Sequence, residues 1–114
     1  MLDDLAARGR LEHTLVIVMS EFGRTPRINY LYGRDHWSAA WSIALAGAGI
    51  RPGMVHGKTN ANGTAVVDEQ VHAGHLFHTY LRAVGLDPSD PFDVNGRAIQ
   101  IADPAATAIK GLLA

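Results

Sequence analysis

Two short polar segments carry the side chains with the clearest capacity for chemistry. The first segment, Ser20–Pro26, directly follows an apolar run and contains Glu21 and Arg24. A carboxylate at the end of a strand can bind a metal ion or act as a general base, and a guanidinium can hold an anion through two parallel hydrogen bonds. The alternative is that these two side chains pair with each other or with their neighbours and only fix the loop.

The second polar segment is Gly33–Trp37, with the sequence GRDHW. Asp35 and His36 offer an oxygen and a nitrogen ligand, and Arg34 adds positive charge for an anionic substrate. Adjacent side chains of an extended chain point to opposite sides. The two therefore share one site only if the backbone turns there or if two metal ions lie close together. Either side chain could instead orient another ligand, or the segment could be a surface loop around a buried Trp37.

Three further histidines, His72, His75 and His78, are spaced at i, i+3 and i+6 within or beside a predicted helix. About 9 Å of helical rise separates the first from the last, which is poor geometry for binding one ion. Their position opposite the apolar stripe of the helix favours a solvated face.

The element that would present the polar segments is the apolar run Leu15–Met19. It is rich in β-branched residues and continuously apolar, which is typical of a strand covered on both faces in a parallel α/β sheet. Residues 20–37 contain glycine, proline and asparagine and predict a long loop, and loops of this length in compact domains are usually either functional or disordered.

The rest of the chain reads as short elements separated by turns. Helices are predicted at residues 1–8 and 73–84, each followed by a glycine suited to the left-handed cap. A second strand is predicted at residues 41–46, and Asn60–Gly63 and Asn95–Gly96 each mark a hairpin. Ala105–Ala114 is predicted to be a weak helix or a frayed tail.

Composition excludes several classes of function. The 114 residues contain no cysteine, so disulfides and thiolate metal sites are excluded. The formal charge of −1 and the pI near 6.6 argue against a nucleic-acid binder. No apolar run is long enough to span a membrane. A transition-metal site would have to use imidazole and carboxylate ligands.

The order and spacing of several segments resemble the carboxy-terminal part of the alkaline phosphatase and sulfatase superfamily, and in particular an uncharacterised bacterial branch, the domain of unknown function 1501. The segments that carry this resemblance are TLVIVMSEFGRTPRIN, GRDHW, SIALAGAGIRPGMVHGKT, and VHAGHLFHTYLRAVGLDP followed by NGR. The resemblance implies that residues 1–114 form a single partial domain. This domain would be the carboxy-terminal portion of a three-layer α/β/α sandwich with a small antiparallel hairpin region.

The resemblance also implies a metal-dependent hydrolase of a phosphate or sulfate ester. Its divalent metal, either zinc, calcium or magnesium, would be bound by Glu21, Asp35 and His36, and the anionic ester by Arg24 and Arg34. Superfamily members end the corresponding strand with a Ser-Asp-His-Gly type turn. Phe22 stands where they have histidine, which places a two-metal site in doubt and leaves a one-metal site open.

The superfamily's nucleophile and first metal ligands precede the region that this chain matches. We therefore expect the 114 residues to be inactive alone and to be either a truncated copy of a longer parent protein or a gene remnant. The resemblance implies that such a parent is exported. The alternative is a non-catalytic structural or binding domain that keeps the fold. A strand at Leu15–Met19 that lacks a neighbour would expose apolar surface, so self-association through that edge is also expected.

Overall fold

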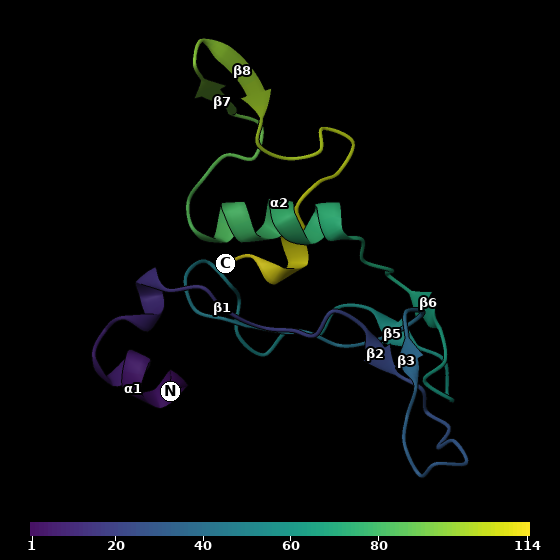
Figure 1. Ribbon diagram of the computed structural model, residues 1–114. Helices are drawn as coiled ribbons and strands as arrows, with labels where there is room; N and C mark the ends of the chain where they lie inside the picture. Colours follow the sequence, from purple (N-terminus) through teal and green to yellow (C-terminus); the bar gives the residue numbers. More distant parts are fainter. The chain divides into compact units, whose positions relative to one another are not determined.

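The computed structural model describes residues 1–114 (Figure 1). The chain divides into two compact units. The first unit comprises residues 1–16, 46–55 and 71–114, and the second comprises residues 17–45 and 56–70. Helices are combined with four two-stranded sheets, so the predicted mixture of helix and strand is present. None of the helices is of a length and hydropathy that would cross a bilayer.

The first unit contains both α-helices. α1 (Leu2–Ala7) ends where Gly9 adopts a φ of 63° and its amide donates to the Ala6 carbonyl at 3.0 Å. α2 (Ala73–Ala83) ends in the same way at Gly85, whose φ is 83°. Both helices and both glycine caps are as the sequence predicts, because a left-handed residue after the last turn satisfies carbonyls that the helix leaves free.

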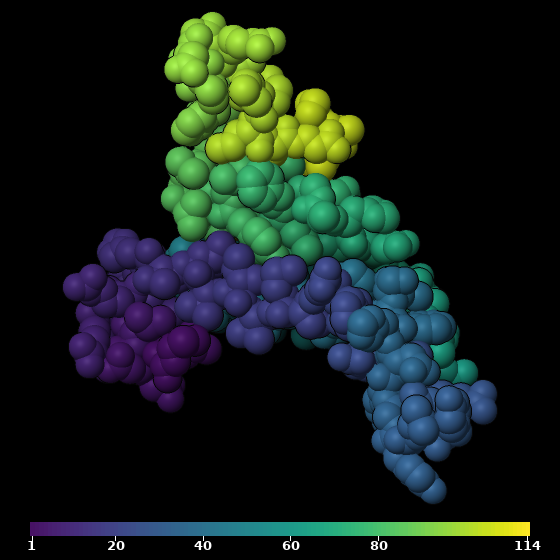
Figure 2. All heavy atoms as spheres, in the orientation of Figure 1, coloured from purple at the N-terminus to yellow at the C-terminus, as the bar shows by residue number.

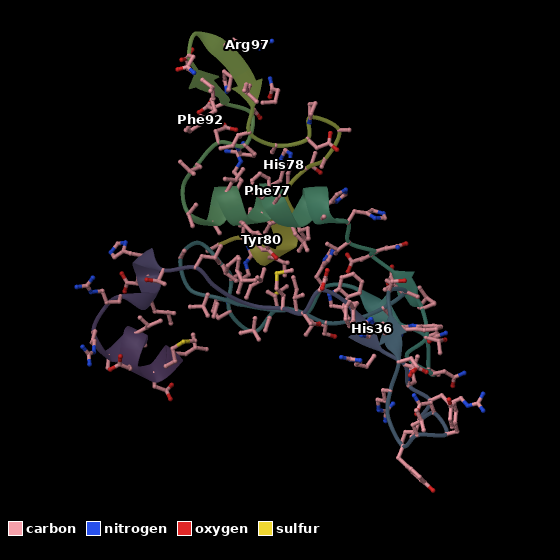
Figure 3. The ribbon with its side chains drawn as sticks, viewed as in Figure 1. His36, Phe77, His78, Tyr80, Phe92 and Arg97 are labelled. Atoms are coloured by element: carbon pink, nitrogen blue, oxygen red, sulfur yellow. The ribbon has the colours of Figure 1, made fainter.

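The buried face of α2 differs from the predicted one. His78 and Thr79 are buried beside Leu81, whereas Phe77 and Val84 of the predicted apolar stripe are exposed. The prediction of a solvated histidine face is therefore wrong for His78. Its Nε2 lies 2.8 Å from the carbonyl oxygen of Asp103, and since a carbonyl can only accept, Nε2 carries the proton. Figure 3 labels His78 and Phe77 on this helix.

The polypeptide after residue 101 covers this face of α2. Ala102, Ala106 and Ile109 are buried, and the Ile109 amide donates to the Thr79 hydroxyl at 2.9 Å. The Thr79 hydroxyl in turn donates to the His75 carbonyl at 2.6 Å. The predicted weak helix or frayed tail is therefore wrong, because non-local hydrogen bonds hold this segment and its local propensity does not encode them.

A glycine-rich turn at residues 47–49 joins the remaining parts of the first unit. Gly47 has a φ of 79°, and a Cβ there would lie 2.2 Å from the Thr14 carbonyl oxygen. The Gly49 amide donates to the Ala83 carbonyl at 2.8 Å, and the Ala114 amide donates to the Gly49 carbonyl at 2.9 Å. The end of α2 and the end of the chain are thus both hydrogen-bonded to the main chain of Gly49.

The first unit also contains two 3-10 helices, η1 (Leu11–His13) and η2 (Lys110–Leu112).

Strand β1 (Val16–Val18) lies within the predicted strand and pairs with β4 (Ala44–Ala46). The predicted cover on both faces is wrong, since Val18 is 62% exposed and Met19 is also exposed. A two-stranded sheet has too few neighbours to bury an apolar strand. The apolar surface that the sequence predicts at this edge is therefore present.

Both predicted hairpins form. β5 (Lys58–Thr59) and β6 (Val66–Asp68) are antiparallel around the Asn60–Gly63 turn. β7 (Pro91–Val94) and β8 (Arg97–Gln100) are antiparallel, with Phe92 opposite Ile99. Asn95 and Gly96 both have positive φ, of 54° and 80°, which is the conformation that a tight two-residue turn requires.

We expect Thr79→Val to lower the free energy of unfolding of the first unit by about 1–3 kcal/mol, because it leaves the buried Ile109 amide without an acceptor. The measurement is urea denaturation followed by the far-ultraviolet circular dichroism of α2. Thr79→Ser should retain most of the stability, and Thr107→Val, at an exposed position, should change it little. Equal stabilities for Thr79→Val and Thr107→Val would contradict the assigned role.

Asp87, just beyond α2, should make the stability of the first unit sensitive to acid. The Ser89 amide, and to a smaller extent Arg82, hold the pKa of the Asp87 carboxyl below its ordinary value of 3.8. A folded-state pKa below the unfolded one adds stability that is present above pH 3.8 and is lost as the pH falls through the folded pKa. Asp87→Asn should therefore flatten the loss of helix signal in acid, measured by circular dichroism against pH.

Candidate functional site

The two polar segments meet in one hairpin of the second unit. β2 (Gly23–Arg24) and β3 (His36–Trp37) pair antiparallel, with Gly23 opposite Trp37 and Arg24 opposite His36. The sequence predicts only a loop over residues 20–37, so this pairing was missed. Each strand is two residues long, which is too short for any periodicity to indicate it.

Gly23 fixes how closely the chain packs at this hairpin. A Cβ at this buried position would lie 2.3 Å from the Ala40 carbonyl oxygen and 3.0 Å from that of Trp37. The Trp37 indole Nε1 donates to the Thr64 carbonyl at 3.0 Å, which ties β3 to the turn between β5 and β6. The hairpin that carries the candidate residues is thus anchored on both strands.

His36 is stacked on Phe22. The two ring centroids are 3.7 Å apart and the planes are inclined by 27°, while the Arg24 guanidinium carbon lies 5.3 Å from the centroid of the Phe22 ring. Strand alternation and register place these three side chains on one face. An exposed imidazole and an exposed guanidinium therefore share the face that Phe22 supports, and Figure 3 shows His36 at this place on β3.

Asp35 contacts a different part of the hairpin from His36. Its Oδ1 accepts a hydrogen bond from Asn29 Nδ2 at 2.9 Å, and its amide donates to the Thr25 hydroxyl at 3.1 Å. Glu21 is exposed at a bend before β2. No three histidine, aspartate or glutamate side chains are gathered where they could hold one metal ion. The assignment of Glu21, Asp35 and His36 as metal ligands stays a prediction.

The two arginines predicted to bind substrate brace the hairpin. Arg24 Nη1 donates to the Arg34 carbonyl at 3.2 Å, and Arg34 Nη1 donates to the Thr25 carbonyl at 2.7 Å and to the Pro26 carbonyl. Both residues are exposed, and a guanidinium has five N–H donors, so each keeps further N–H groups for an anion. The structure brings Arg24 to the face of His36 and uses Arg34 to close the loop.

A family model described as a protein of unknown function, DUF1501, matches residues 1–113. The chain belongs to the DUF1501 family. No curated protein and no solved structure matches it.

Two residues of this DUF1501 chain matter more to the hairpin than sequence reasoning indicates. Asn29 Oδ1 accepts from the amides of Leu31 and Gly33, both at 3.0 Å, and the Thr25 hydroxyl donates to the Arg27 carbonyl at 2.8 Å. Asparagine and threonine commonly bond to nearby backbone in turns, so their types are a signal for such roles. Nothing in the sequence shows that Asn29 also reaches Asp35 six residues away.

Tyr80 of α2, in the first unit, is a further residue that the sequence does not single out for chemistry. Its hydroxyl oxygen is buried without a hydrogen-bond partner, and this burial raises the pKa of the phenol. A buried hydroxyl without a hydrogen-bond partner lowers the stability of the folded state, so Tyr80 marks an unsatisfied polar group inside the first unit.

In the DUF1501 hairpin, Gly23→Ala should lower the stability of the second unit by about 1–3 kcal/mol, because the added methyl group meets backbone that cannot yield. Tryptophan fluorescence during urea denaturation reports this unit, since both tryptophans lie within it. Gly33→Ala is the matched control, because a Cβ there would meet nothing closer than 3.7 Å. A similar loss in both variants would contradict the packing argument.

Proposed function

We propose that this chain is the carboxy-terminal portion of a metal-dependent hydrolase with an alkaline-phosphatase-like α/β/α sandwich. The reaction would be hydrolysis of a phosphate or sulfate ester, with His36 at the metal and Arg24 and Arg34 at the anionic group. The observation that carries the proposal is the shared face of His36 and Arg24, which would set a metal ligand beside a group that binds anions.

The donor types fit a divalent metal, but the chain does not gather a complete set. Glu21, Asp35 and His36 supply the oxygen and nitrogen ligands that zinc, calcium or magnesium use. Only His36 lies with Arg24 on one face, and no group of three donors is assembled. We therefore derive no reaction step through a metal. The proposal requires further ligands and the nucleophile from outside these 114 residues, as the superfamily resemblance implies.

Phe22 supports a site with fewer ligands than the two-metal phosphatases have. In the alkaline phosphatase and sulfatase superfamily, which the sequence resembles, a histidine stands at the place of Phe22. The Phe22 ring lies directly against His36. A histidine there would put two imidazoles next to each other, whereas phenylalanine supplies only a flat apolar support. Such a support restricts the orientation of His36, which is what a metal ligand needs.

The decisive experiment uses the longer protein that we propose contains this segment. It should bind a divalent metal and hydrolyse p-nitrophenyl phosphate or p-nitrophenyl sulfate, whereas residues 1–114 alone should not. His36→Ala should lower metal content and reduce kcat/KM by about 10²-fold or more, because it removes a proposed ligand. His13→Ala, an exposed histidine of η1, is the control and should leave both unchanged.

A non-catalytic structural or binding domain is the second candidate. The observation in its favour is that Arg24, Arg34 and Asp35 already bond within the hairpin, so each has a structural reason to be present. A longer protein that carries no metal and hydrolyses neither ester would support this candidate and contradict the first. If His36→Ala leaves the metal content unchanged, then His36 is not a metal ligand, and the rest of the hydrolase proposal is unaffected.

A further inference from the structure

The tip of the loop between β2 and β3 carries three consecutive large side chains that are largely exposed. Tyr30 is 88% exposed, Leu31 is 71% exposed and Tyr32 is 94% exposed, and Ile28 nearby is more than half exposed. In Figure 1 the loop extends away from its two strands, and Figure 2 shows it as a narrow projection. The second unit therefore displays a group of large, exposed side chains at the tip of this loop.

Hydrogen bonds fix the backbone conformation of this tip. The Asn29 amide donates to the Gly33 carbonyl at 2.8 Å, and the Tyr32 amide donates to the Asn29 carbonyl at 3.1 Å. The Asn29 side chain accepts from the amides of Leu31 and Gly33. Tyr32 has a φ of 61°, which is uncommon for a bulky residue and persists only where the surroundings hold it. The loop thus presents Tyr30, Leu31 and Tyr32 in a fixed arrangement.

The loop carries a net positive charge. Residues 22–35 contain Arg24, Arg27 and Arg34 against one carboxylate, that of Asp35, which accepts a hydrogen bond from Asn29, in a chain whose formal charge is −1. All three arginines are exposed. An apolar tip is therefore followed, toward the strands, by a local basic zone.

We propose that this loop, residues 25–34, anchors the protein peripherally to a lipid surface that contains anionic headgroups. Leu31 and Ile28 would enter the acyl boundary, the two tyrosines would lie at the interface with their hydroxyls toward water, and Arg27 would meet lipid phosphates. A lipid interface would remove from water the apolar side chains that the tip exposes.

Two features favour lipid over other partners. Single-stranded nucleic acid would use the tyrosines for stacking but has no use for the aliphatic Leu31 and Ile28. The fixed backbone also fits membrane insertion, since no ordering of the loop opposes it.

The test is co-sedimentation of the full 114-residue chain with vesicles of phosphatidylcholine, with and without phosphatidylglycerol. We expect the partition coefficient to be about fivefold or more higher on the anionic vesicles, and to fall as sodium chloride is raised. Leu31→Ser should reduce partitioning about fivefold or more, because it removes the apolar tip and leaves all charges in place. Phe92→Ser, at an exposed apolar position of β7, is the matched control and should bind as the unchanged chain does.

Arg27→Gln should weaken partitioning to anionic vesicles and leave the low partitioning to neutral vesicles unchanged. Inorganic phosphate should compete no better than sodium chloride of equal ionic strength, which separates a lipid surface from a free-phosphate site. No binding to anionic vesicles, equal binding to both vesicle types, or full binding by Leu31→Ser would each overturn the proposal. Binding of a single-stranded oligonucleotide that Leu31→Ser leaves intact, with no vesicle binding, would assign the arginines to nucleic acid instead.

Discussion

Close approach of one stretch of main chain to another, possible only at glycine, is the constraint on which both units depend. Gly23 allows β2 to approach the Ala40 and Trp37 carbonyls, and Gly47 lies where a side chain would collide with the Thr14 carbonyl. Gly74 brings α2 against Ala106 in the same way, since a Cβ there would lie 2.9 Å from the alanine methyl group. With few large side chains fully buried, backbone contact takes over part of the role that a core of large apolar residues has elsewhere.

Hydrogen bonds over long sequence separations complete this arrangement. The Thr79 hydroxyl links α2 to Ile109, and the Trp37 indole links β3 to Thr64. The Ile109 amide is buried and would lack a partner without the Thr79 hydroxyl, so removing that bond costs more than forming it contributes. The chain is thus held by a small number of specific polar contacts, and each unit has its own set.

The parts of the fold that could be predicted from the sequence are those set by local chemistry. The 3.6-residue period and Gly85 define α2, and Asn95–Gly96 defines the β7–β8 turn. The β2–β3 pairing and the ordering of the tail around Ile109 were not predictable, because they depend on partners far along the chain. The candidate site shows the same division. Residue types pointed to His36 and Arg24, but only the register shows that they face the same side, and only the Asn29 bond shows that Asp35 turns elsewhere.

The β7–β8 hairpin is exposed at every residue of both strands, and its register rests on the turn and on cross-strand pairs. The strand residues are exposed, so their side chains can change without removing buried contacts. The turn is different, because it needs the positive φ that Asn95 and Gly96 adopt. The hairpin is therefore a permissive position for protein engineering. An epitope or a small tag inserted at its tip would be displayed in solvent, and the packing of α2 against the tail would not have to change.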